Sequence, residues 1–168
     1  MATLAKALER HKPRKSDVQK RKKDYDLLNI PHIVDGFNNQ DPEIRQDAIE
    51  KWAHAITENP GEERVMRHFS RILEHLSDPN THVMVAALDA YAAAAQANPS
   101  DPRLTENLMR IAEMFNDPDN FVRTAALKAW KEVYLNNPDH PKVKLTSKAY
   151  ETARKTSGKD TFTEYKTL

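Results

Sequence analysis

An offset of 39 residues organises most of this 168-residue chain. When the sequence is shifted by that interval, Trp52, Tyr91 and Trp130 fall on one another. Three further apolar sets coincide under the same shift: Ile44, Val83 and Val122; Ile49, Leu88 and Leu127; and Phe37, Leu76 and Phe115. A period of about 40 residues is typical of stacked helix pairs, because one pair cannot bury its apolar face alone. The sequence therefore predicts an all-α chain that forms a short α-solenoid of three antiparallel helix pairs.

The first pair shows how the sequence specifies one unit. Apolar residues at i, i+3, i+4 and i+7 run from Ile30 to Phe37 and predict a helix that ends at about Asn38. Asp41 is the expected N-cap of the second helix, and Pro42 suits its first turn because no N–H is needed there. Five residues of this second helix are expected to face inward: Ile44, Ala48, Ile49, Trp52 and Ile56.

The offset divides the chain into regions. The repeat body covers residues 25–141, with three units at about 27–60, 64–99 and 103–138. In the second unit we expect helices over 65–76 and about 80–97, and in the third over 103–115 and about 119–135.

Both ends lie outside this pattern. Residues 1–24 predict a basic, partly helical arm. Residues 142–156 predict a C-terminal capping helix with a polar outer face. Its expected buried residues are Val143, Ala149, Tyr150 and Ala153. Residues 157–168 are too polar to fold alone, so we expect a tail that is disordered or lies along the solenoid or a partner.

The opening of the second helices resembles the HEAT-repeat family, in which this helix starts with a Val-Arg pair. Ile44-Arg45 and Val122-Arg123 match this pair, whereas the middle unit has Val83-Met84. The resemblance extends over about residues 27–138. It implies that the second helices line the concave side, and that each arginine pairs with an acid at a neighbouring turn. Asp78 and Asp117 are the candidate acids.

Charge is distributed unevenly along the chain. Residues 1–24 contain nine Lys or Arg against three Asp or Glu, and residues 142–168 contain seven against three. The body between them therefore has ten basic and nineteen acidic residues. Basic ends suggest an anionic partner, either an acidic protein surface or a nucleic acid, or ends that fold back on the acidic body. A basic run is equally consistent with a solvated tail. The candidate residues are Lys12, Arg14, Lys15, Lys20, Arg21, Lys22 and Lys23.

The second helix of the middle unit is rich in alanine, which favours helix formation and also lets a partner approach the backbone closely. We expect its outward residues and the adjoining ridge of the third unit to form a protein-binding concave ridge. Phe121 stands where the other units have polar residues, so it either covers a neighbouring unit or anchors a partner. The predicted ridge consists of Val85, Asp89, Ala92, Ala93, Gln96, Phe121 and Lys128.

The sequence offers little for catalysis. It has no cysteine, so thiolate nucleophiles and thiolate metal sites are excluded. His68 and His75 lie seven residues apart without converging acids, and we expect the histidines to face solvent and no metal to bind. Trp52 and Trp130 belong to the inward stripe and are expected to pack in the core. No catalytic residue and no cofactor is predicted.

These features favour a non-catalytic scaffold or adaptor, expected to be a small subunit of a larger assembly, as most HEAT-like proteins are scaffolds and adaptors. The alternative is a protein that binds nucleic-acid phosphates through its basic ends. No small-molecule substrate is expected. No apolar run reaches the roughly 18 residues of a membrane span, and no secretory h-region is evident. We expect an intracellular, cytoplasmic location, with organellar import left open by the basic N-terminus.

Overall fold

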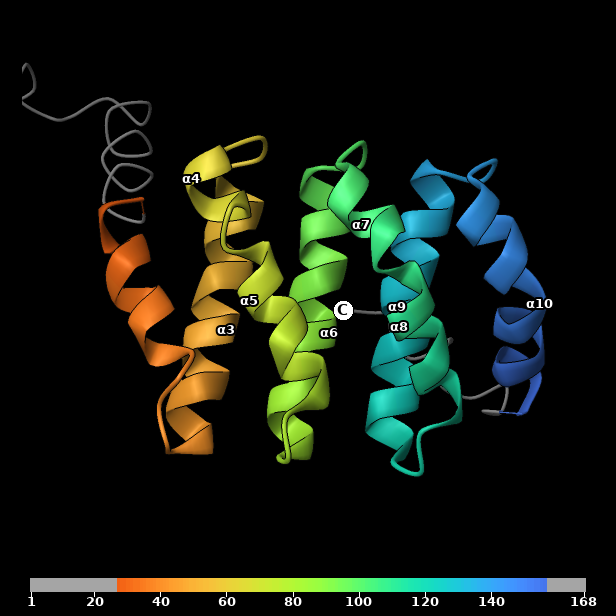
Figure 1. Cartoon of the computed structure of the whole chain (residues 1–168), viewed down its shortest axis with the longest axis horizontal. Helices are drawn as coiled ribbons and strands as arrows, with labels where there is room; N and C mark the ends of the chain where they lie inside the picture. Colours follow the sequence, from red (N-terminus) through yellow and green to blue (C-terminus); the bar gives the residue numbers. More distant parts are fainter. Residues whose placement is uncertain (1–26, 157–168) are drawn as a thin grey trace, which may run out of the picture.

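The computed structural model describes residues 27–156, which are helical and contain no strand. Three helices of 17 residues start 39 residues apart: α3 (Pro42–Glu58), α6 (Thr81–Ala97) and α9 (Asn120–Asn136). We call these the B helices. They lie in a row, with α6 packed between α3 and α9 (Figure 1). The prediction of an all-α chain is confirmed over the described range.

Each B helix begins at a side chain that caps its first free N–H groups. The carboxylates of Asp41 and Asp119 and the side-chain oxygen of Asn80 each accept from the N–H two residues further on, at 2.9, 2.7 and 2.9 Å. These contacts satisfy donors that have no partner within the helix. Pro42 occupies the first turn of α3, as predicted.

The segments that precede α6 and α9, which we call the A segments, are broken. The first consists of α4 (Glu63–Met66), α5 (Phe69–Glu74) and the 3-10 turn η1 (His75–Ser77). The second consists of α7 (Pro102–Glu106), α8 (Leu108–Glu113) and the 3-10 turn η2 (Met114–Asn116). The predicted single helices over 65–76 and 103–115 are therefore wrong, whereas the first unit has one helix over residues 27–36.

Ring donors of the B helices bind the first piece of each broken segment. Trp52 Nε1 donates to the carbonyl of Val65 at 3.1 Å, and the Tyr91 hydroxyl donates to the carbonyl of Leu104. Both contacts are buried and span 13 residues. They satisfy the polar atom of a ring whose apolar body fills the core. The predicted packing role of the tryptophans is confirmed.

The chain's last described element is α10 (Pro141–Thr156), which packs against α8 and α9 and is not broken. Trp130 Nε1 here donates to the hydroxyl of Thr146 at 2.7 Å, and Tyr150 stacks on the Trp130 ring with centroids 4.1 Å apart. The helix predicted over 142–156 is confirmed. The expectation that Ala149 is buried is wrong, because Thr146 takes the inner position.

Of the five inward residues predicted for α3, four are buried and Ile44 is not. Ile44 is 45% exposed, whereas Val83 and Val122 at the same register are fully buried. The difference follows from position, because α3 is the first B helix of the described row and has no earlier one beside it. Positions that are equivalent under the 39-residue offset can therefore differ in burial, because different numbers of helices pack against them.

Candidate functional site

The exposed side of α6 and α9 forms the candidate site, which we call the B-helix face. Within each helix, residues at i, i+3, i+7, i+11 and i+14 lie on one side, opposite the core. The face consists of His82, Val85, Asp89, Ala93 and Gln96 from α6 and Phe121, Thr124, Lys128, Glu132 and Leu135 from α9. Six of the seven predicted ridge residues belong to it.

Ala92 does not belong to this face, contrary to the prediction. It is only 1% exposed, whereas its neighbour Ala93 is partly exposed. Successive residues of a helix are rotated by about 100°, and α6 has a B helix on each side of it. Only a narrow stripe of α6 is therefore left open, and Ala92 falls beside it.

A charged pair links the two helices across the face. Lys128 Nζ lies 2.7 Å from Asp89 Oδ1, and the two side chains are 39 residues apart in the sequence. Both are about half exposed, so the pair contributes little to stability. Glu50 holds the equivalent position on α3, so the residue at this repeat position is acidic in α3 and α6 and basic in α9.

Two large apolar side chains of the face are exposed. Phe121 is 72% exposed and Leu135 is 58% exposed. Among the described residues Phe121 is therefore not packed against a neighbouring unit, and its role as a partner anchor stays a prediction. Leu135 was missed from the sequence, although the offset could have found it: its equivalents are Thr57 and Gln96.

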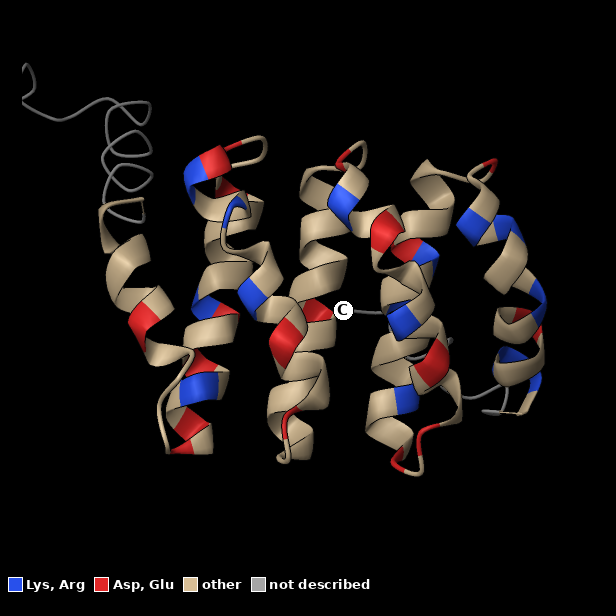
Figure 2. Ribbon diagram, in the orientation of Figure 1, with Lys and Arg blue, Asp and Glu red and all other residues tan. Residues whose placement is uncertain are grey.

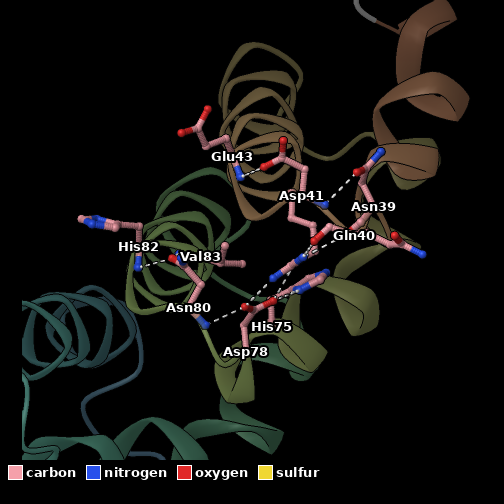
Figure 3. A network of polar contacts seen from close by, with 10 residues as sticks. Asn39, Gln40, Asp41, Glu43, His75, Asp78, Asn80, His82 and Val83 are labelled. Carbon is pink, nitrogen blue, oxygen red and sulfur yellow. Dashed lines mark hydrogen bonds and ion pairs between the residues drawn. The ribbon is translucent and has the colours of Figure 1, made fainter.

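A buried polar network lies between the first two units (Figure 3). Arg45 Nε and Nη2 donate to the two carboxylate oxygens of Asp78 at 2.9 and 2.8 Å, as the family resemblance implied. Arg45 also binds the carbonyls of Asn39 and Gln40. Arg123 differs, since it reaches the main-chain carbonyl of Asp117 at 2.8 Å rather than a carboxylate.

His75 completes this network, and the expectation that it faces solvent is wrong. The side chain is buried, with Nδ1 3.3 Å from Asp78 Oδ2 and the ring edge-on to Phe37. Burial of Asp78 disfavours its charged form, but hydrogen bonds from Arg45, Asn80 N–H and His75 outweigh this and lower its pKa. These contacts hold two units together and offer no open site.

His68 is half-buried between two arginines and accepts from Arg67 Nε at 3.1 Å. Burial, followed by the charges of Arg67 and Arg71, lowers the pKa of His68.

Within residues 27–156, no three His, Asp or Glu side chains come close enough to hold a metal ion together. None of the helices in this range is long and apolar enough to cross a bilayer.

The predicted anion-binding residues lie outside the described residues: Lys12, Arg14, Lys15, Lys20, Arg21, Lys22 and Lys23. The predicted tail, 157–168, also lies outside them. The structure therefore brings together the B-helix face alone among the predicted sites.

In comparisons with known proteins, no family model, no curated protein and no solved structure matches this chain.

Proposed function

We propose that this chain is a short HEAT-like α-solenoid that acts as a non-catalytic protein-binding scaffold or adaptor in a larger assembly. The solenoid description is supported by B helices of equal length and equal offset, capped in the same way at Asp41, Asn80 and Asp119. It is also supported by the ring donors that bind the following A segment.

The exposure of Phe121 carries the functional proposal. The same position holds Glu43 in the first unit and His82 in the second, both exposed. The fold therefore tolerates a polar residue here, and an exposed phenylalanine adds nothing to folding. Large aromatic side chains on a surface are typical anchors of protein interfaces.

The surroundings of Phe121 favour a protein partner. Val85 and Ala93 leave the middle of the face low and apolar, and Leu135 adds a second apolar group about 14 residues, or roughly 20 Å, along α9. The Asp89–Lys128 pair lies between them and offers both signs of charge for orientation. Binding would combine a modest apolar patch with polar contacts and involve no covalent step.

Residues at equivalent positions of the other units provide substitutions that test the role of Phe121. Phe121→Glu installs the residue that the first unit carries, and Met109→Ser installs the second unit's Ser70 on α8, away from the face. Tagged chains would be purified from their own cell and their partners quantified by mass spectrometry. We expect Phe121→Glu to lose a partner by tenfold or more, in keeping with loss of an interface anchor, and Met109→Ser to retain it. Unchanged partners with Phe121→Glu would contradict the proposal.

A further inference from the structure

A stripe of three lysines on α10 defines a second surface, separate from the B-helix face. Lys144, Lys148 and Lys155 stand at i, i+4 and i+11, which places them on one side of the helix. All three are exposed, and Val143 and Tyr150 are buried on the opposite side. We call the three lysines and the adjacent Leu145 the α10 face.

The position of α10 at the end of the described row accounts for a polar surface but not for the sign of its charge. A terminal helix needs only polar outer residues, which can be acidic or basic. α10 has five Lys or Arg and one Glu, whereas the other described residues, 27–140, have ten Lys or Arg and eighteen Asp or Glu. Figure 2 shows basic positions along α10 and mostly acidic ones along the bottom of the row. The positive face is thus an exception within an acidic body.

The lysines also do little for the helix itself. Lys144 and Lys148 are like charges one turn apart, which is mildly unfavourable. The first turn of α10 contains no acidic residue, and positive charge at that end opposes the helix dipole. Lys144 forms an ion pair with Asp139 at 2.9 Å, but Lys148 and Lys155 form none with any described residue.

Leu145 is the second feature of the α10 face, beside the lysine stripe, that helix stability does not explain. It borders the stripe and is 70% exposed. α10 begins 39 residues after α7, and at this spacing from Leu145 the two A segments hold Glu106 and Arg67. A helix that closes the row gains nothing from an exposed leucine. An apolar side chain beside a row of cations instead matches a ligand that has both carboxylates and an apolar group.

We propose that the α10 face binds an acidic amphipathic segment of a partner protein. Carboxylates of the segment pair with Lys144, Lys148 and Lys155, and an apolar side chain packs on Leu145. A phosphate backbone has no apolar group that could pack on Leu145. The acidic remainder of the body also repels a polyanion longer than α10. One exposed leucine is far less than the apolar face that a membrane-surface helix buries.

The proposal can be tested with peptides of defined sequence. A library of random 16-residue peptides would be selected for binding to the full chain, and the best binders synthesised with a fluorescent label. We expect selected sequences rich in Asp and Glu that also contain a large apolar residue. Their affinity, from anisotropy, should fall about tenfold with Lys148→Glu/Lys155→Glu and severalfold with Leu145→Ser.

Lys51→Glu/Arg67→Glu is the matched control, since it makes the same change of charge at two exposed residues of the first two units, outside both the α10 face and the B-helix face. It should leave the affinity within twofold, and circular dichroism should show that all variants remain helical. Three results would overturn the proposal: selected peptides without acidic enrichment, equal losses with the control pair, or tighter binding of a 20-nucleotide polyuridylate than of the best peptide. None of these results bears on Phe121, so the proposed function is tested separately.

Discussion

Arg45 and Asp78 are 33 residues apart in the sequence and form a bidentate ion pair across the junction of the first two units. The pair is almost fully buried, with side chains 13% and 5% exposed. The next junction has no such pair, because Met84 replaces the arginine while Asp117 keeps the acid. The two junctions therefore differ in what holds them together.

We expect Arg45→Met, the residue that the second unit carries, to lower the urea midpoint of unfolding. The carboxylate of Asp78 would remain buried without its strongest partner, which costs more than losing both partners. Arg45→Met/Asp78→Asn should therefore be less destabilised than the two single changes summed, as a double-mutant cycle measures. Lys51→Met, which removes the exposed pair with Asp47, should leave the midpoint unchanged. Additive single changes would contradict the coupling.

The lowered pKa of Asp78 makes the stability of the chain depend on pH. A carboxylate with a folded-state pKa below its unfolded value of about 3.9 stabilises the fold above that pH. The contribution is lost as the pH falls through the folded-state pKa. We expect the wild type to exceed Asp78→Asn in free energy of unfolding at about pH 5. The margin should shrink below about pH 4, and an increase there would contradict this account.

Gly36 lies where the first helix contacts α3. A Cβ at this position would be 2.7 Å from the Cβ of Ala48. Although alanine favours helix by up to about 1 kcal/mol, we expect Gly36→Ala to destabilise by about 1 to 3 kcal/mol through overpacking. Ala48→Gly in the same chain should restore part of the loss. Urea unfolding of the two single variants and the double variant checks this, and a stabilised Gly36→Ala would refute the close approach.

The hydroxyl of Tyr91 binds the carbonyl of Leu104 in the core. Tyr91→Phe leaves that buried oxygen without this donor and should cost about 1 kcal/mol. Tyr134→Phe is the matched control, because Tyr134 is partly exposed on α9 and its hydroxyl has no hydrogen bond within the described residues. Thermal unfolding monitored by circular dichroism compares the two, and equal effects would show that the Leu104 contact is not responsible.

Ala92 and Ala93 are adjacent in α6 but differ in burial. Ala92→Arg forces a charged side chain between packed helices and should cost more than about 3 kcal/mol or prevent folding. Ala93→Arg places the same side chain on the B-helix face and should change stability by less than about 1 kcal/mol. Soluble yield and urea midpoints distinguish them, and comparable stability of the two variants would contradict the burial of Ala92.

The sequence alone determined the B helices to within about two residues, because their signals are local. Asp41 and Asp119 cap α3 and α9 through N–H groups two residues away, and Asn59, Asn98 and Asn137 follow the last turns. The inward tryptophans and the Arg45–Asp78 pair were also predictable, the first from periodicity and the second from the resemblance to HEAT repeats.

What depends on neighbouring elements could not be read from the sequence. The burial of His75 and the exposure of Ile44 both result from what packs beside each residue, and the breaks in the A segments had no signal that we recognised in the sequence. The same holds for the candidate site. Ala92 and Phe121 were both predicted to belong to the ridge, but flanking helices bury Ala92 whereas Phe121 remains exposed. Periodicity determines which way a side chain points along its own helix, and only the tertiary structure decides whether another element meets it there.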